Sequence, residues 1–306
     1  MPGVRTIAVI NQKGGVGKTT TVANLGAAIA DSGRGVCLLD LDPQAHLSLH
    51  FGVEPTDDKP GMYEVISGDA KLRETLQHVR SSLWLAASSI DLAGAEVEMV
   101  NTVGREQVLR DAFGEAALSY DFTFIDCPPS LGLLTLNALA AADEVIIPLQ
   151  PHFLALQGLG KLLETVSLVQ RRINPSLRVS GVILCMYETT TRLAGEVRDD
   201  LREFLASARG GDAPWSAAYV FETFIRRNVK LAECPSYGST IFDYDRSSHG
   251  ARDYAALAEE FLAMRAALPV CKEHIPQQYV PHWASTNAMT EAPPPTSTEQ
   301  HPEPRE

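Results

Sequence analysis

The stretch Ile10–Gly26, INQKGGVGKTTTVANLG, decides the fold of this chain. It begins within a short apolar run, Thr6–Gln12, that predicts a strand, and it leads into a helical pattern over about residues 18–32. Glycines in such a loop let backbone N–H groups converge on phosphate oxygens, and the N-terminus of the helix adds a favourable dipole. The stretch therefore predicts a nucleotide-binding loop.

Residue types assign roles within the loop. We expect Lys18 to reach the β- and γ-phosphates of a nucleotide and the Thr19 hydroxyl to ligate Mg²⁺. A Gly-rich turn that merely precedes a capped helix is the alternative, and the order of strand, glycines, Lys-Thr and helix disfavours it. The residues expected to line the nucleotide are Lys13, Gly14, Gly15, Val16, Gly17, Lys18, Thr19 and Thr20.

Carboxylates follow two later strands. Asp40 and Asp42 end the apolar run Gly35–Asp42, and Asp126 lies near the end of Phe122–Cys127. In an open parallel sheet the ligand binds at the carboxyl ends of the strands. One acidic strand end could simply cap the next helix, but two beside a phosphate loop indicate an ATPase site. We expect Asp126 to hold Mg²⁺ through water and Asp40 to lie close to the metal.

Apolar runs alternate with helical patterns along most of the chain. Further predicted strands are Leu83–Ser88, Glu144–Gln150 and Val179–Tyr187. Predicted helices include Gly104–Leu118, Leu156–Arg172, Leu193–Ala208 and Ala251–Leu268, with a surface loop at Ala208–Tyr219. Strands that are apolar on both faces and joined by helical crossovers predict an α/β fold, a doubly wound, mostly parallel sheet flanked by helices.

Composition suggests a soluble globular protein, because 45% of the 306 residues are hydrophobic and 21% are charged. Residues 1–270 are expected to form the nucleotide-binding domain. Residues 271–306, rich in Pro, Thr and Glu, are expected to be a disordered tail.

Five scattered cysteines without a C-x-x-C pair argue against a disulfide framework or a zinc site and suit the reducing cytoplasm. No apolar run approaches the roughly 18 residues needed to span a bilayer. The formal net charge of −12 argues against nucleic-acid binding through the overall field. Any DNA contact would therefore need a local basic patch.

The loop departs from the usual spacing G-x-x-x-x-G-K-[ST], because Gln12 stands where the first glycine is expected. In its form K-G-G-V-G-K-T it resembles the deviant Walker A loop of the ParA/MinD family of P-loop ATPases. The resemblance implies that Lys13 crosses a dimer interface and touches the phosphates of the partner's nucleotide, as an arginine finger does elsewhere. It also implies that Asp42 positions the attacking water beside the metal. A solvated lysine is the alternative for Lys13.

The resemblance extends over about residues 4–268 and is to Soj-type ParA partition proteins. It is specific in two segments, Asp126–Gln150 and Arg227–Asp245. It implies Mg²⁺-dependent ATP hydrolysis that is slow without a partner, a homodimer in the ATP state, a ParB-like partner, and a cytoplasmic, nucleoid-associated protein. Met186 and Asn228 match base-contacting positions, although a methionine after a strand is more often a core residue. The acidic, Pro-rich end of the chain differs from the membrane-binding helix of MinD-type proteins, so no membrane binding is expected.

The same resemblance implies non-specific DNA binding, which would fall steeply with salt. The family pattern is rearranged here, because Thr190, Ser247 and His249 stand where arginines are expected. The candidate DNA-contacting residues are Arg192, Arg226, Arg227, Lys230 and Arg246.

A solvated face with ordinary ion pairs is the alternative for this cluster. In that case the protein could be an ATP-dependent positioner of a protein cluster or a cellulose-synthesis complex that does not bind DNA. A metabolic P-loop enzyme is a third, weaker possibility. Three histidines, His46, His50 and His249, show no ligand spacing and are expected at the surface.

Overall fold

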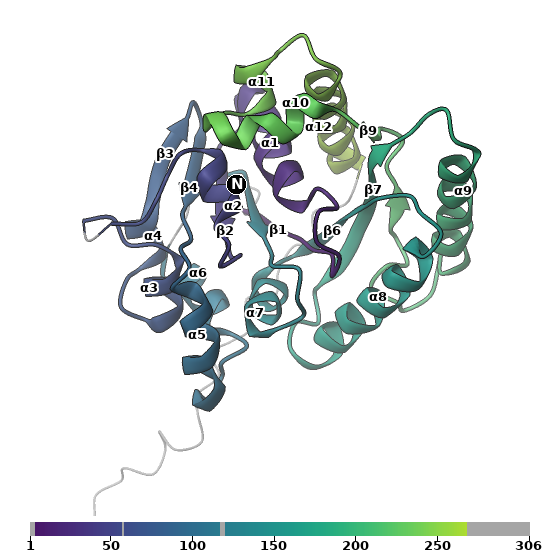
Figure 1. Ribbon diagram of the computed structural model, residues 1–306. Coiled ribbons are helices and arrows are strands. Elements are labelled where there is room, and N and C mark those ends of the chain that lie inside the picture. Colours follow the sequence, from purple (N-terminus) through teal and green to yellow (C-terminus); the bar gives the residue numbers. More distant parts are fainter. Residues whose placement is uncertain (1–3, 57, 117–119, 268–306) are drawn as a thin grey trace, which may run out of the picture. The chain divides into compact units, whose positions relative to one another are not determined.

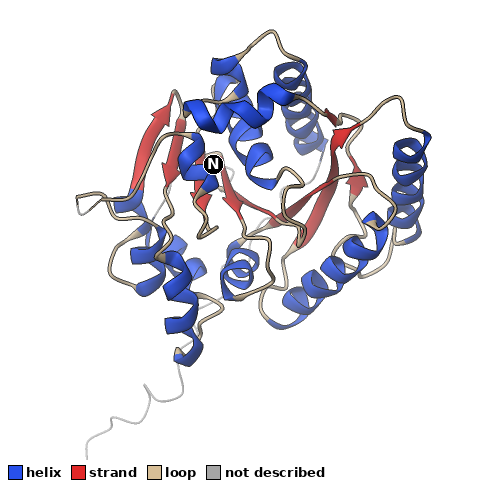
Figure 2. Cartoon of the chain, in the orientation of Figure 1, coloured by secondary structure: helices blue, strands red, loops and turns tan. Residues whose placement is uncertain are grey.

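A computed structural model describes residues 4–56, 58–116 and 120–267 (Figure 1). Within these residues a twisted sheet runs through the centre and helices cover both of its faces (Figure 2). The predicted tail at 271–306 lies outside the described residues. None of the described helices is long and apolar enough to cross a membrane.

The sheet has the strand order β3-β4-β2-β5-β1-β6-β7-β8, with β9 also paired to β7. All neighbouring pairs are parallel except β3 and β4, which are antiparallel. The prediction of a doubly wound, mostly parallel α/β sheet is thus confirmed. The strands are β1 Arg5–Val9, β2 Val36–Asp40, β3 Leu76–Arg80, β4 Leu83–Ala86, β5 Phe122–Asp126, β6 Glu144–Leu149, β7 Arg178–Tyr187, β8 Tyr219–Val220 and β9 Ile225–Arg226.

Helices connect most of the strands and bury one apolar face each. The longer helices are α1 Lys18–Asp31, α6 Val108–Ala116, α7 Leu133–Ala141, α8 Ala155–Arg172, α9 Arg192–Ser207 and α12 His249–Ala267. The shorter ones are α2 His46–His50, α3 Met62–Ser67, α4 Leu72–Thr75, α5 Leu92–Glu98, α10 Val229–Glu233 and α11 Ile241–Tyr244, with 3₁₀ turns η1 Met99–Asn101 and η2 Cys234–Tyr237.

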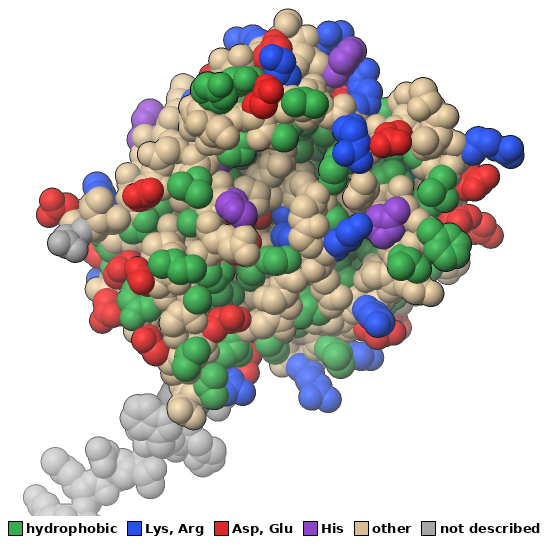
Figure 3. All heavy atoms as spheres, viewed as in Figure 1, with side chains coloured by type: hydrophobic (Ala, Val, Ile, Leu, Met, Phe, Trp, Pro, Cys, Tyr) green, Lys and Arg blue, Asp and Glu red, His purple; other side chains and the backbone are tan. Residues whose placement is uncertain are grey.

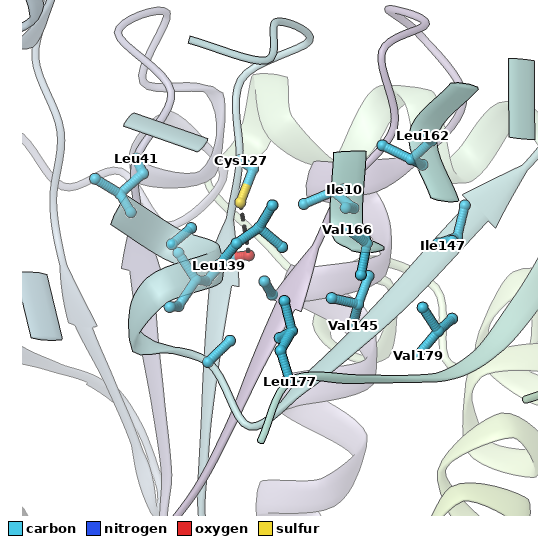
Figure 4. Close-up of a cluster of buried hydrophobic side chains, with 14 of the residues drawn as sticks. Ile10, Leu41, Cys127, Leu139, Val145, Ile147, Leu162, Val166, Leu177 and Val179 are labelled. Atoms are coloured by element: carbon cyan, nitrogen blue, oxygen red, sulfur yellow. Dashed lines mark hydrogen bonds between the residues drawn. The ribbon is translucent and has the colours of Figure 1, made fainter. Parts of the chain in front are cut away.

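Two apolar cores lie on opposite faces of the sheet. Successive residues of a strand point to opposite faces, so Ile7 and Val9 of β1 pack with α1 and α12, whereas Ala8 packs with α7 and α8. Figure 4 shows part of the second core, where Val145 and Ile147 of β6 lie near Val166 of α8. Burial on both faces explains why the central strands read as continuous apolar runs.

Several boundaries differ from the predicted ones for identifiable reasons. The helix expected from Gly104 begins at Val108, because Gly104 adopts φ 76° in a turn closed by the bond from Gln107 N to its carbonyl. The edge strand β3 was not predicted, since its residues are only partly buried and lack an apolar run. The loop at 208–219 is not wholly at the surface, because Ala218 is buried and Pro214 O accepts a hydrogen bond from Val179 N.

His50 was expected at the surface, and that prediction is wrong. His46 and His249 are exposed, but His50 lies fully buried at the end of α2. Neither of its ring nitrogens has a hydrogen-bond partner among the described residues. Burial lowers the pKa of His50 to about 4, and the backbone of Ser239 opposes this shift only weakly. The imidazole is therefore neutral at physiological pH.

This depressed pKa predicts a loss of stability in mild acid. The unfolded chain, with His50 at its ordinary pKa of 6.5, binds a proton that the folded chain does not, so stability is lost between pH 6.5 and 4. At pH 6.0 the loss from His50 should be about 0.8 kcal/mol relative to pH 7.5 or above. Urea unfolding measures the free energy of unfolding at pH 7.5 and pH 6.0. The difference between the two pH values should be smaller in His50→Gln than in wild type by about 0.8 kcal/mol.

The matched control is His46→Gln, because His46 is exposed on the same helix. It should leave the pH dependence of wild type intact. An unchanged pH dependence in His50→Gln would show that His50 titrates normally in the folded state.

Candidate active site

The phosphate loop connects β1 to α1 at the carboxyl end of the sheet. β1 lies between β5 and β6, so the loop opens over the middle of the sheet. Gly15 and Gly17 have φ values of 72° and 97°, a region that other residues rarely adopt. A Cβ at Gly14 or Gly15 would meet no atom within 4 Å, so the backbone there is open to a ligand. The loop thus has the exposed backbone that a phosphate cradle requires.

Lys18 occupies the first position of α1 and is 6% exposed. Burial lowers the pKa of its ammonium, and the charges of Asp126 and Asp42 act in the opposite direction. A buried cation flanked by two carboxylates is therefore fixed at the N-terminus of the helix. This is the position from which a lysine can contact phosphate oxygens.

Asp40 and Asp126 lie opposite each other at the ends of the paired strands β2 and β5. Both are fully buried. Neither carboxylate oxygen of Asp126 has a hydrogen-bond partner among the described residues. Burial, and next the charge of Asp40, raise the pKa of Asp126 well above its usual value, and the nearby Thr19 hydroxyl and the charge of Lys18 act in the opposite direction. An unpartnered buried carboxylate next to a phosphate loop fits a magnesium ion that arrives with the nucleotide.

Asp40 has a different environment. Its Oδ1 accepts a hydrogen bond from Asp42 N at 3.1 Å, and its Oδ2 accepts bonds from Ser48 N at 2.8 Å and Ser48 Oγ at 2.7 Å. Burial raises the pKa of Asp40 to about 6, and the bonds from Ser48 oppose that rise. Asp40 lies near the predicted metal position, as expected, but both of its oxygens are already used by the protein.

The residues present suit Mg²⁺ better than a metal held by protein alone. The described residues contain no group of three or more His, Cys, Asp or Glu side chains that could hold a metal ion. Mg²⁺ in nucleotide sites is usually bound through one or two carboxylates, water and the phosphates themselves. Thr19 and Asp42, the other predicted ligands, lie beside Lys18 and Asp126.

Lys13 lies on the exposed side of the same loop. Its Nζ is 2.9 Å from Nε2 of His152, which follows β6, and its backbone N–H donates to Asn11 Oδ1 at 3.0 Å. Partial burial, and next the charge of Lys13, lower the pKa of His152, which favours the neutral imidazole that can accept this bond. A cleft of about 380 Å³ between the loop and α8 is lined by Lys13, His152 and Lys161, among others.

Met186 lies on β7 next to Cys185, and Asn228 follows β9, which pairs with β7. Cys185 packs against Gly17, and Met186 follows it with φ 51°, an unusual backbone conformation for methionine. Asn228 begins α10, and its Oδ1 accepts the Lys230 N–H at 2.9 Å. The cap uses the amide oxygen, so the amide NH₂ is the group that Asn228 can offer to a base.

The five predicted DNA-contacting residues do not form one free basic surface. The Arg226 guanidinium binds both oxygens of buried Asp253, and this raises the pKa of Arg226. Arg227 pairs with Glu188 at 3.1 Å, and Lys230 lies 4.0 Å from Glu233. Figure 3 shows acidic and basic side chains interspersed on the face that it presents.

The remaining two predicted contacts, Arg192 and Arg246, are exposed. Neither has an acidic partner within the described parts of the chain.

Comparison with known proteins gives a consistent result. A family model described as an AAA domain matches residues 4–179. The chromosome partitioning protein ParA of Myxococcus xanthus is 42% identical over 259 residues, which cover 84% of this chain and 88% of that protein. The chain belongs to the ParA/MinD family of ATPases. This confirms the resemblance deduced from the phosphate loop.

Other known proteins match over a similar range. The sporulation initiation inhibitor protein Soj of Bacillus subtilis is 42% identical over 260 residues, covering 85% of this chain and 98% of Soj. The crystal structure of a cobyrinic acid a,c-diamide synthase from Mycobacterium smegmatis, with bound ATP analogue and magnesium, is 36% identical with a TM-score of 0.71. It covers 87% of this chain and 97% of that one.

Sequence reasoning missed three groups that contact the predicted ParA/MinD-family site. His152 meets Lys13, Ser48 binds Asp40, and Cys185 packs under Gly17. His152 and Cys185 lie far from their partners along the chain, whereas Ser48 follows Asp40 closely, and none belongs to a recognisable spacing. Strand pairing brings His152 and Cys185 to the loop, and the turn after β2 brings Ser48 back to Asp40.

The contrast between the two buried carboxylates gives a prediction. Asp126→Asn removes a buried charge without breaking a described hydrogen bond, whereas Asp40→Asn disturbs bonds from Ser48. We expect the free energy of unfolding of the nucleotide-free protein to fall by about 2 kcal/mol in Asp40→Asn and by less than about 1 kcal/mol in Asp126→Asn. Urea unfolding of the two variants measures both values.

Calorimetric titration with ATP provides the companion readout. In Asp126→Asn the addition of Mg²⁺ should no longer strengthen ATP binding. Equal destabilisation by both substitutions, or an intact magnesium effect in Asp126→Asn, would contradict the roles assigned to the two carboxylates.

Proposed function

We propose that this protein is an ATP-driven dimerisation switch whose two-fold dimer forms around ATP and Mg²⁺. The observation that supports it best is the different placement of two lysines in one loop. Lys18 is buried beside Asp126, and Lys13 is exposed and bound to His152. A lysine on the exposed side of the loop is accessible to a second copy of the chain, whereas Lys18 would bind the nucleotide of its own chain.

In the proposed site Lys18 and the backbone of Gly14–Gly17 bind the phosphates, while Thr19, Asp42 and Asp126 hold the magnesium ion. When bound, Mg²⁺ neutralises charge on the phosphates. Asp42 orients the attacking water, and Lys13 of the second copy stabilises the transferring phosphoryl group. Hydrolysis then returns the dimer to monomers, so ATP selects between two association states.

Two further residues, Met186 and Asn228, are proposed to contact the adenine. Both adjoin the strand that packs under Gly17. Asn228 would do so through its amide NH₂, since its oxygen caps α10.

We further propose that the switch partitions chromosomal or plasmid DNA together with a ParB-like, centromere-binding partner, in the cytoplasm and on the nucleoid. Relatives described as chromosome partitioning proteins, at about 40% identity over most of the chain, support this. The DNA backbone would be contacted non-specifically by Arg192, Arg227, Lys230 and Arg246. Arg226 would contribute only after exchanging Asp253 for a phosphate.

Positioning of a protein cargo without DNA is the second candidate. The observations that favour it are the net charge of −12 and the acidic partners of Arg226, Arg227 and Lys230. A metabolic role, suggested by the cobyrinic acid synthase relative, is a third. Dimerisation driven by ATP would count against that role.

Lys13→Ala tests the proposed action of Lys13 in the dimer. The substitution should abolish ATP-driven dimerisation, because the charge that crosses to the second nucleotide is removed. Nucleotide binding by the monomer should stay within about threefold of wild type, since Lys18 remains. Light scattering coupled to gel filtration, with ATP and Mg²⁺, measures the first effect, and equilibrium binding of a fluorescent ATP analogue measures the second.

Lys161→Ala is the matched control, because Lys161 lines the same cleft but is not part of the phosphate loop. It should dimerise as wild type does. A Lys13→Ala protein that dimerises normally with ATP would overturn the proposed role of Lys13.

Asp42→Ala should accumulate the ATP-bound dimer, because the water is no longer oriented. This protein allows DNA binding to be measured without turnover. We expect salt-sensitive binding to a non-specific duplex with ATP but not with ADP, falling by a factor of about 10 or more when Arg227 and Lys230 are replaced by alanine. Fluorescence anisotropy at 50 mM and 150 mM salt measures it.

The control for the DNA experiment is Arg209→Ala, a basic residue outside the proposed patch, which should not change binding. A confirmed ATP dimer of Asp42→Ala that fails to bind DNA would leave the ATPase proposal intact and favour the protein-cargo positioner. An Asp42→Ala protein that stays monomeric in excess ATP would contradict the role of Asp42.

A further inference from the structure

A buried hydrogen-bond chain links the ends of β2 and β4 to the short helix α2. Ser48 Oγ donates to Asp40 Oδ2 at 2.7 Å and accepts from the backbone N–H of Ser88, just beyond β4, at 2.8 Å. Ser48 N also donates to the same Asp40 oxygen. Asp40, Ser48 and Ser88 are each at most 1% exposed. Buried bonds of this kind are shielded from water and hold their geometry well.

These buried hydrogen bonds fix the backbone around Asp42. Asp42 N donates to Asp40 Oδ1, and Leu41 N donates to Asp126 O at 2.9 Å. Beyond Asp42, its carbonyl accepts from Ala45 N at 2.8 Å, and its Oδ1 accepts from Gln44 N at 3.0 Å. The residues from 40 to 45 therefore form a closed turn, anchored at one end by Asp40.

The far end of this turn is strained. Ala45 begins α2 in the left-handed region, with φ 52° and ψ 31°, although it is not a glycine. Such a conformation is unfavourable for a residue with a Cβ and persists only when its surroundings enforce it. The next residues of α2 are anchored through Ser48, so the bond to Asp40 is the contact that holds the turn closed.

We propose that Asp40 and Ser48 are positioning residues for ATP hydrolysis, which hold Asp42 in place without contacting nucleotide or metal themselves. This inference rests on the proposed role of Asp42 in orienting water. Both oxygens of Asp40 are occupied by protein donors, whereas those of Asp126 are not, so the two carboxylates have separate tasks. A small displacement of a catalytic group lowers the rate strongly while binding stays nearly constant.

Ser48→Ala is the test, with Ser88→Ala as its matched control. Both serines are buried, but Ser88 takes part in the chain only through its backbone N–H, which the control retains. Ser48→Ala should lower kcat for ATP by a factor of about 10 or more, with the dissociation constant for ATP within about twofold of wild type. Its ATP dimer should also last longer, and Ser88→Ala should match wild type in all three measurements.

Hydrogen exchange of the nucleotide-free protein gives a readout that is independent of turnover. The amides of residues 41–48 should exchange about tenfold faster in Ser48→Ala than in Ser88→Ala, because one of the two hydrogen bonds from Ser48 to Asp40 is lost. If Ser48→Ala does not fold, Ser48→Cys, a near-isosteric variant with a weaker donor, should show the same pattern.

A double-variant experiment separates this inference from the proposed function. In an Asp42→Ala background, Ser48→Ala should not lower the residual single-turnover rate further, because it acts through Asp42. An equal loss in both backgrounds, or a Ser48→Ala protein with the kcat of Ser88→Ala, would overturn the positioning role and leave Asp42 untouched. Normal turnover by Asp42→Ala alone would overturn the proposed role of Asp42 and the inference with it.

Discussion

Two carboxylates buried side by side at the carboxyl end of the sheet are the constraint on which the site depends. The parallel register of β2 and β5 sets Asp40 opposite Asp126, and burial raises the pKa of both. Like charges in a low-dielectric interior are unfavourable unless each is compensated. The chain compensates Asp40 with three protein donors, whereas Asp126 is compensated by the nearby Thr19 side chain and the charge of Lys18. The two carboxylates therefore differ in how far the protein itself satisfies them.

The phosphate loop presents a similar division between its two lysines. Gly17, with its positive φ, begins α1 and turns Lys18 inward beside the buried acids. Lys13 lies before the glycine pair and stays in contact with solvent, where the neutral imidazole of His152 accepts a bond from its ammonium. That bond involves exposed groups and is therefore weak. The proposed role of Lys13 requires that this bond be exchanged for a phosphate of a second nucleotide.

Which basic side chains at the surface can bind a polyanion depends on their ion pairs and not on the overall composition. The bidentate contact of Arg226 with Asp253 is partly buried, so separating it leaves a carboxylate poorly hydrated. The pair between Arg227 and Glu188 is exposed, and pairs of this kind contribute little and are screened by salt. Basic residues in such exposed pairs are available to a polyanion, whatever the net charge of the chain. The balance between DNA and protein cargo therefore depends on a few local contacts.

The sequence by itself determined the α/β fold, the phosphate loop and the family, because strand, glycines, Lys18 and helix are consecutive and Asp126 directly ends an apolar run. It did not reveal the antiparallel strand β3, whose partly polar residues resemble a loop, or the burial of His50. It assigned the metal to Asp126 and placed Asp40 only near it, but it did not reveal that protein N–H groups occupy both oxygens of Asp40. These features depend on contacts with other parts of the fold, such as the contact of Ser48 on α2 with Asp40 at the end of β2. Only the tertiary structure determines those contacts, because no local pattern of residue types predicts them.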